Sequence, residues 1–559
     1  MSALDGRSSR PEVPTVADLI GRTVASLGAR QAFGLVGSGN FDVSNALTRA
    51  GVAFVPARHE MGAVVMADAF SKVSGRLGVV TLHQGCGLTN AVTGIAEAAK
   101  SRTPLLVLAA DTARAAVGSN FRIDQDSLVR SVGAVAERVH GSASAAEDIR
   151  RAHWRAAEGR RTVVVSIPTD VQEVLAQDQS TPAPVSPLLP PRPNAALVSH
   201  VADLLLAARS PVIVAGRGAR GQRTVIERLG ELTGAVLATT AVARGLFAGN
   251  PWSVDVCGGF SSPTGARLIS RGDVVIGLGA ALNVWTTRHG RLLRDASTLI
   301  HVDLDPEAIG AHYPAGIGVI ADVGETAAAL VAEIEDRGGN SSHRRTTELA
   351  AEIAAGAWSL EPYEEASTDG AIDPRTLSKV LDRVLPAERT VAVDSGHFVG
   401  WPSRYLSVPD EQGFVFSQAF QSVGLGLASA IGAAIARPDR VTVAALGDGG
   451  ALMGLAELET VARLRLRMVI VVYNDQAYGA EAHHFGPEDK PLDLVRFPDT
   501  DFAAIGRAVG LAGLTVLKAA DLDALAAWVD RGGEGGVIVD AKIVPTLVAD
   551  WLEEAFHAH

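Results

Sequence analysis

Residues 441–481 read VTVAALGDGGALMGLAELETVARLRLRMVIVVYNDQAYGAE, and this stretch decides the fold. An apolar, β-branched run ends in a Gly-Asp-Gly turn at Asp448, and a second apolar run ends in Asn-Asp at Asp475. Between the two runs, apolar residues recur at helical spacing, which predicts strand, helix and strand. Two parallel strands joined by a helix place both acidic turns at one edge of a sheet. We therefore expect the carboxylates of Asp448 and Asp475 to meet.

These two acidic turns have the chemistry of a magnesium-diphosphate site. Carboxylate oxygens are ligands that Mg²⁺ prefers, and glycines at the end of a parallel strand let the backbone approach a phosphate. A Gly-Asp-Gly sequence also occurs as a plain turn, and that alternative stays open for the first turn taken alone. The second acidic turn at the matching distance favours the metal site.

The rest of the chain repeats the same alternation of short apolar runs and helical patterns in three blocks. Such alternation predicts α/β architecture with three doubly wound parallel-sheet domains, each sheet covered on both faces. The proline-rich segment 181–196 is predicted to be a connector, because it cannot continue a helix or a central strand. Segment 336–373 is predicted to be the second connector, with a glycine- and serine-bearing stretch, a short helical pattern and an acidic stretch. The predicted domains are 1–180, 197–335 and 374–559.

Composition limits the classes of partner. The chain has 559 residues, 47% hydrophobic content and a net charge of −12, and it has no long basic run, which argues against nucleic acid. Two cysteines, Cys86 and Cys257, are too few for a disulfide framework and fit a reducing compartment. The N-terminus lacks an apolar signal region, and no apolar run approaches membrane-spanning length. We expect a cytoplasmic protein without a membrane partner.

The acidic turns and the three-block order resemble the thiamine-diphosphate-dependent decarboxylase and acetolactate synthase family. The resemblance implies pyrimidine-binding, central and diphosphate-binding domains in that order, with thiamine diphosphate and Mg²⁺ as cofactors. It makes Asp448 the first metal ligand, Asp475 the second, and Ala477 the donor of a backbone carbonyl. The second ligand is more often Asn in this family, so Asp475 adds a negative charge. The cofactor-binding set is completed by Gly447, Gly449, Gly450 and Tyr478.

Glu60 is the expected partner of the cofactor's aminopyrimidine ring. It follows His59 at the predicted start of a helix, where the helix dipole alone favours an acidic residue, and that plain role remains an alternative. In the resembled family, a His-Glu pair before a helix of small residues supplies the glutamate that hydrogen-bonds this ring. A carboxylate there favours the imino tautomer, which serves as the internal base.

Two glycine-bearing turns, GLVGSGN at 34–40 and TLHQGCGLTN at 81–90, are expected on the substrate side. Their closest match within the family is benzoylformate decarboxylase, which implies that Ser38 contacts substrate and that His83 is the active-site histidine. Acetolactate-synthase-like members usually have Gly-Pro-Gly where this chain has Gly-Cys-Gly. A structural role for His83 in the loop is the alternative, although a histidine near neutral pH is suited to moving protons.

The last block carries four further residues that the resemblance brings to the cofactor. Ser395 and His397 lie in a loop expected against the diphosphate and the aminopyrimidine. Val423 takes the place of the bulky apolar residue that holds the cofactor in its bent shape. Glu481 matches an active-site glutamate of pyruvate decarboxylases, with a solvated helix start as the alternative. A transition-metal site at the adjacent histidines 483 and 484 is not expected, because their spacing is wrong.

The substrate pocket is predicted to include Asn120, Thr286 and His484. In the central block, the sequence GRGARG lacks the full spacing of a dinucleotide loop, so FAD is compatible with this domain but not favoured. The resemblance therefore implies decarboxylation of a small-molecule 2-oxo acid, with addition to a second carbonyl as a neighbouring outcome.

Three alternatives remain open: an acetolactate-synthase-like carboligase with or without FAD, a hydrolase, oxidase or lyase of the same cofactor group, and a non-enzymatic binding protein. Because family members build each active site from two subunits, a homodimer or homotetramer with active sites at subunit interfaces is expected.

Overall fold

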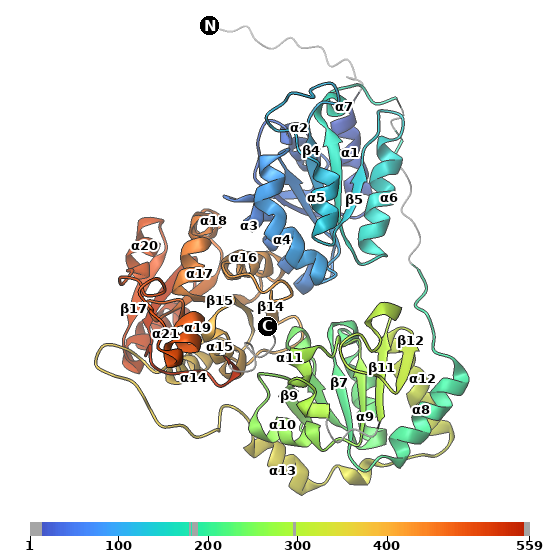
Figure 1. The fold of residues 1–559 in the computed structure, drawn as a ribbon, viewed down its shortest axis with the longest axis vertical. Coiled ribbons are helices and arrows are strands. Elements are labelled where there is room, and N and C mark those ends of the chain that lie inside the picture. The colour runs from blue at the N-terminus through green and yellow to red at the C-terminus, as the bar shows by residue number, and fades with distance from the viewer. Residues whose placement is uncertain (1–13, 178–179, 182–187, 294–297, 553–559) are drawn as a thin grey trace. The chain divides into compact units, whose positions relative to one another are not determined.

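The computed structural model describes residues 14–177, 180–181, 188–293 and 298–552. The described residues form two compact units. The first contains those up to 181 together with Gln418–Ala436, and the second contains Leu188–Ser417 and the remainder from Arg437 onward. Three six-stranded sheets occur in these units, and within the described residues the paired strands of each sheet are parallel (Figure 1). The predicted α/β class with three doubly wound parallel sheets is confirmed, whereas the domain boundaries stay a prediction.

The first sheet has the strand order β2-β1-β3-β4-β6-β5. Its central strands are buried on both faces, as expected of continuous apolar runs in a parallel sheet. The strands are β1 (Gln31–Gly34), β2 (Ala53–Pro56), β3 (Gly78–Leu82), β4 (Leu105–Asp111), β5 (Val135–Arg138) and β6 (Thr162–Pro168). The helices are α1 (Val16–Ser26), α2 (Phe41–Arg49), α3 (Glu60–Ser74), α4 (Cys86–Lys100), α5 (Gln125–Ser131), α6 (Ala145–Ala157) and α7 (Thr169–Gln172).

The second sheet has the order β12-β11-β10-β7-β8-β9. Its strands are β7 (Pro211–Ala215), β8 (Val236–Thr239), β9 (Ser253–Val256), β10 (Val274–Leu278), β11 (Thr298–Asp303) and β12 (Ile317–Ile320). The helices are α8 (Ala195–Ala207), α9 (Arg223–Thr233), α10 (Pro263–Ser270), α11 (Val284–Thr287), α12 (Val323–Asp336) and α13 (Thr347–Ala355). The second predicted connector thus carries a helix, α13. Residues 182–187 of the first connector lie outside the described residues, and 188–194 form neither helix nor strand.

The third sheet, ordered β14-β13-β15-β16-β18-β17, contains the stretch that decides the fold. Its strands are β13 (Arg389–Val393), β14 (Phe414–Phe416), β15 (Val441–Gly447), β16 (Met468–Asn474), β17 (Ala512–Val516) and β18 (Gly536–Lys542). The helices are α14 (Pro374–Val384), α15 (Gly400–Tyr405), α17 (Asp448–Met453), α18 (Leu458–Leu464), α19 (Gly479–Phe485), α20 (Phe502–Ala508) and α21 (Asp523–Asp530). Among the described helices, none has the length and apolar character needed to cross a bilayer.

Helix α16 (Gly426–Ala436) packs against α3 in the first unit, although it lies far from α3 in the sequence. The two helices approach so closely that a Cβ on Gly432 would collide with the backbone of Met66. Just before α16, the backbone N–H of Phe420 donates to Glu97 Oε2 over 2.7 Å. These contacts tie the segment that carries Val423 to the helices that carry Glu60 and Glu97.

Candidate active site

The carboxyl groups of Asp448 and Asp475 lie together at the carboxyl edge of the third sheet. β15 ends at Gly447 and α17 begins directly at Asp448, so the expected turn is the first turn of a helix. Asp475 follows β16, and its side chain is hydrogen-bonded to that of Asp448. Burial raises the pKa of Asp448 to about 6, and burial together with the charge of Asp448 raises the pKa of Asp475 to about 7. Two desolvated like charges are costly to hold so close.

The surrounding backbone shapes this edge for a cation and a phosphate. The N–H of Ala477 donates to Asp475 Oδ1 over 3.2 Å, and the N–H groups of Gln476 and Ala477 also bond Asp448. A Cβ on Gly479 would collide with Oδ2 of Asp475, so any larger residue there would displace this carboxylate. A divalent cation between the carboxylates would offset their repulsion with oxygen ligands. The donor set therefore fits the expected metal.

His397 offers a buried hydrogen-bond donor in the same unit. Its Nε2 accepts the backbone N–H of Ala549 over 3.1 Å, so this nitrogen carries a lone pair. Burial lowers the pKa of His397 to about 3, and the neutral ring therefore has its proton on Nδ1. Within the described residues this buried Nδ1 has no hydrogen-bond partner. An unmet donor of this kind fits an anionic oxygen, such as one of a diphosphate.

A ring nitrogen of His397, a carboxylate oxygen of Asp475 and a ring nitrogen of His483 lie within 4.8 Å of one another. The two imidazole rings are 4.2 Å apart between centroids. A metal ion needs a free lone pair on each nitrogen, but the lone pair of His397 is already used by the N–H of Ala549. With His397 in this tautomer, the cluster is a hydrogen-bonding group and not a metal site. His483 belongs to it, although no motif in the sequence predicts that position.

Glu60 opens α3 in the first unit, as expected, with His59 as the N-terminal cap. Its side chain is buried, and Oε2 accepts a hydrogen bond of 3.1 Å from the amide of Asn90 on α4. A Cβ on Gly87 would lie 3.5 Å from Glu60 Oε1 and 2.9 Å from the Cβ of His83. Gly87 thus leaves room between the glutamate and the histidine. Asn90, which the sequence analysis did not single out, fixes the direction of the carboxylate.

Ser38 and His83 face each other from the two glycine-bearing turns. Ser38 Oγ is 3.4 Å from His83 Nε2, and His83 Nδ1 is 2.9 Å from the carbonyl of Gln84. Because a carbonyl only accepts, Nδ1 carries the proton and Nε2 keeps its lone pair toward Ser38. The buried side chain of Asn40 holds the serine turn by accepting the N–H of Gly37 and donating to the carbonyl of Leu35. The half-buried His83 can therefore take up a proton at Nε2.

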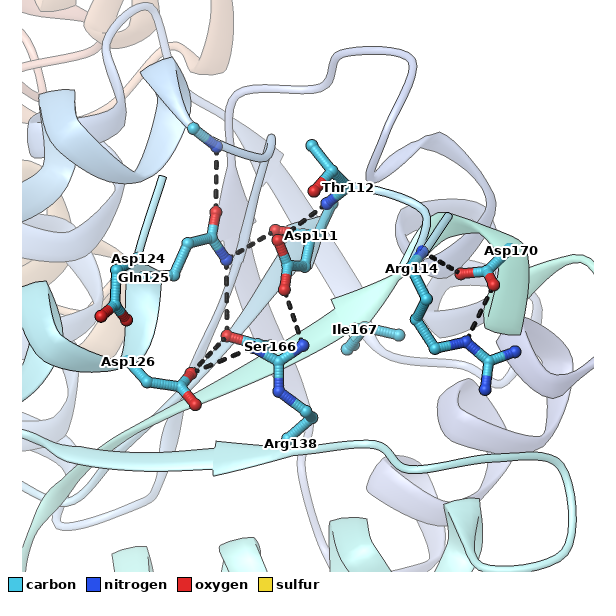
Figure 2. Close-up of polar contacts among 12 residues, drawn as sticks. Asp111, Thr112, Arg114, Asp124, Gln125, Asp126, Arg138, Ser166, Ile167 and Asp170 are labelled. Atoms are coloured by element: carbon cyan, nitrogen blue, oxygen red, sulfur yellow. Dashed lines mark hydrogen bonds and ion pairs between the residues drawn. The ribbon is translucent and has the colours of Figure 1, made fainter. Parts of the chain in front are cut away.

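Gln125 fixes the turn that carries His83 (Figure 2). Its buried amide accepts the N–H of Gly85 over 2.9 Å and donates to the carbonyl of Ala110 over 3.0 Å and to Ser166 Oγ over 3.4 Å. Figure 2 shows this amide beside the ion pair in which Arg138 Nη1 contacts Asp111 Oδ2 at 2.6 Å. The only sign of Gln125 in the sequence was a polar residue near the start of a short helix, which is too common to be informative.

The other predicted residues fall into the same two units. Asn120 and Val423 are exposed in the first unit. In the second, Glu481 is exposed on α19, whereas His484 on α19, Thr286 on α11 and Ser395 after β13 are half-buried. The structure thus brings together Ser38, His83 and Glu60 in one unit, and Asp448, Asp475 and His397 in the other.

Comparison with known protein families identifies the family whose active site these side chains form. Three domains described for thiamine pyrophosphate enzymes match the chain in order: the N-terminal binding domain at residues 14–130, the central domain at 198–330 and the C-terminal binding domain at 394–541. The chain belongs to the thiamine pyrophosphate enzymes. Within this thiamine pyrophosphate enzyme, Glu60 lies in the N-terminal match, and the acidic pair lies in the C-terminal match.

Relatives of this thiamine pyrophosphate enzyme differ in their reactions. A catabolic acetolactate synthase of Raoultella terrigena is 28% identical, over 95% of this chain and 96% of its own. A sulfoacetaldehyde acetyltransferase of Rhodobacter capsulatus is 28% identical over 87% of each chain. A probable 2-ketoarginine decarboxylase of Pseudomonas aeruginosa is 29% identical, over 94% of this chain and 93% of its own. The cofactor, thiamine pyrophosphate (the same molecule as thiamine diphosphate), is common to the matched domains, whereas carboligation, acyl transfer and decarboxylation all occur among the names.

Proposed function

We propose that this enzyme decarboxylates a 2-oxo acid with thiamine diphosphate and Mg²⁺, and that addition to a second carbonyl is a side outcome. When bound, the cofactor supplies an electron sink for the carbon that loses CO₂. The observation that carries the choice of decarboxylation is the position of His83, whose Nε2 faces Ser38 beside Glu60 while its Nδ1 is bonded to a carbonyl. Decarboxylation to an aldehyde ends with a proton delivered to carbon, and a histidine of this kind can exchange that proton with solvent.

The chain's other residues have supporting roles in this proposal. Asp448, Asp475 and the carbonyl of Ala477 hold the metal, while the Nδ1–H of His397 and the N–H groups around Gly449 bind the diphosphate. Glu60 hydrogen-bonds the aminopyrimidine. Val423 supports the bent cofactor, and Glu481 acts toward the substrate with Asn120, Thr286 and His484. As implied by the family resemblance, we propose a cytoplasmic homodimer or homotetramer with its active sites at subunit interfaces.

The decarboxylase proposal is tested by measuring CO₂ release from a panel of 2-oxo acids, with and without an aldehyde acceptor. The proposal expects CO₂ and free aldehyde from at least one acid without acceptor. CO₂ that appears only with an acceptor would instead indicate a carboligase. No CO₂ from any acid, with cofactor binding intact, would contradict decarboxylation and leave a hydrolase, oxidase or lyase of the same cofactor group.

A carboligase is the second candidate, because two of the relatives named above are an acetolactate synthase and an acetyltransferase. An FAD-containing version of it would purify as a yellow protein with flavin absorbance. A colourless protein that releases a condensation product would favour the version without FAD.

His83→Ala is expected to slow aldehyde release by about 10²–10⁴-fold, the usual contribution of a general acid or base. Cofactor affinity, followed by tryptophan fluorescence, should stay unchanged because His83 lies in the turn assigned to the substrate side. The matched control is His200→Ala, which removes an exposed histidine on α8. If His83→Ala releases aldehyde as fast as the control, His83 is a loop residue and not a proton carrier.

Mg²⁺ affinity is expected to rise with pH through the range of about 6 to about 7. Protons and the metal compete for Asp448 and Asp475, whose pKa values are raised to about 6 and about 7. The stability of the metal-free protein is expected to change in the opposite direction. Raised carboxyl pKa values stabilise the fold at low pH, and this stability is lost as pH rises from about 4 to about 7. Mg²⁺ titrations at about pH 5 and about pH 8 check the pH dependence of metal affinity. Thermal unfolding at the same two pH values checks the pH dependence of stability. An affinity independent of pH would contradict these carboxylates as ligands.

A further inference from the structure

A cavity of about 200 Å³ lies in the second unit. β9, the start of α10, residues 353–359 and α15 surround it. We call it the arginine cavity, and the residues that matter for its chemistry are Arg244, Arg404, Phe260, Trp358, Tyr405 and Ser359. Of the described residues that line it, none belongs to the predicted cofactor or substrate set.

Three arginine side chains are buried in and beside this cavity. Those of Arg244 and Arg404 line it and are each 5% exposed, and that of Arg389 is 2% exposed. Arg389 is close enough to Arg244 that, after burial itself, repulsion by Arg244 helps to lower its pKa. The guanidinium groups have thus lost water, and those of Arg244 and Arg389 repel each other, which is unfavourable without negative charge nearby.

Two of the carboxylates that pair with these arginines, those of Asp255 and Asp550, are more than half exposed, whereas that of Asp382 is half-buried. The side chains of Asp255, Asp382 and Asp550 are 52%, 26% and 64% exposed. A carboxylate in contact with solvent is screened and compensates a buried cation only in part. The lining holds two arginines, Arg244 and Arg404, and two aspartates, Asp255 and Asp382, so its formal charge is balanced. A ligand would therefore be held by guanidinium donors that these ion pairs leave unmet.

Two of the buried guanidinium nitrogens lack acceptors within the described residues, namely Arg244 Nη1 and Arg404 Nε. Arg244 contacts only one oxygen of Asp255, at 3.3 Å and 3.4 Å, and Asp255 has a left-handed φ of 59°. The pair is long for a charge-assisted hydrogen bond, which is normally about 2.7–2.9 Å. Arg244 consequently has hydrogen-bonding capacity left over.

The walls and the volume of the arginine cavity limit the size and chemistry of a ligand that could bind there. Phe260, Trp358 and Tyr405 give the cavity an aromatic wall, and the guanidinium carbon of Arg404 lies 4.1 Å from the centre of the Trp358 ring. A volume of about 200 Å³ is below the about 300–1,000 Å³ of pockets for drug-sized ligands, so a nucleotide is too large. We propose that the arginine cavity binds a small oxyanion, either phosphate or a short-chain carboxylate, with Arg244 as its main ligand.

The proposal is tested on the holoenzyme, saturated with thiamine diphosphate and Mg²⁺ so that the cofactor site is filled. The unfolding temperature is measured while sodium phosphate or sodium succinate is titrated, with sodium chloride at equal ionic strength as the reference. A ligand that binds only the folded protein raises this temperature saturably. We expect a saturable rise with phosphate or with succinate and none with chloride, and the salt that acts identifies the source of the oxyanion.

Three variants locate the binding. Arg244→Gln removes the charge and is expected to weaken the response at least tenfold, since about 1.4 kcal/mol corresponds to tenfold. Arg244→Lys keeps the charge and should restore part of it. Ser359→Trp places a bulky side chain on the exposed rim and should block the response even if Arg244→Gln folds poorly. Equal behaviour of the three salts, or an unchanged response in Ser359→Trp, would overturn the proposal.

Discussion

Glu60→Gln lowers turnover by about 10²–10⁴-fold, the range expected when a proton-transfer partner is lost, and leaves cofactor binding nearly intact. Glutamine has the same shape and still receives the hydrogen bond from Asn90, so α3 keeps its position. It cannot, however, favour the imino tautomer of the aminopyrimidine as a carboxylate does. Steady-state turnover and a cofactor titration by tryptophan fluorescence separate the two effects.

The matched control for this variant is Asp42→Asn. Asp42 is also an acidic residue in the first turn of a helix, α2, but it is exposed. Both changes remove a charge that favours the helix dipole, which is worth about 0.3–1 kcal/mol. If Glu60 acts only as a helix-start residue, the two variants will lose equally little activity. Equal and small losses would therefore contradict the assignment of Glu60.

Asp448→Asn is expected to abolish Mg²⁺-dependent cofactor binding, with an affinity loss above about 100-fold. Outer partners of metal ligands already cost about 10–100-fold when they are removed, and Asp448 is proposed as a direct ligand. The same change should raise the unfolding temperature of the metal-free protein near pH 8, because it removes one of two repelling buried carboxylates. A higher unfolding temperature in this variant would show that its loss of cofactor binding does not come from a damaged fold.

Asp475→Asn is the graded comparison for that experiment. It also relieves the repulsion in the metal-free protein, but it keeps a carbonyl oxygen where the resembled family often has Asn. We expect its cofactor affinity to fall much less than that of Asp448→Asn. If Asp448→Asn still binds cofactor as tightly as Asp475→Asn, then the acidic pair is not the metal site.

The predictable part of the fold came from strands that are buried on both faces. The runs at 105–111, 441–447 and 468–474 are continuous and apolar, and they form β4, β15 and β16. By contrast, β5, β9, β12, β14 and β17 are short strands at a sheet edge. Edge strand β5 mixes buried and half-buried positions, and β17 mixes buried, half-buried and exposed ones, so neither has a clear period.

The sequence by itself determined the three parallel sheets and the meeting of Asp448 with Asp475, because a strand–helix–strand unit has one hand and returns to the same sheet edge. It also placed Glu60 at the start of a helix. Only the tertiary structure decided the protonation sites of His83 and His397, the hydrogen bond from Gln125 to Gly85 and the contact of α16 with α3. The physical reason is distance along the chain: the N–H of Ala549 reaches His397 across 152 residues, and no local pattern encodes such a contact.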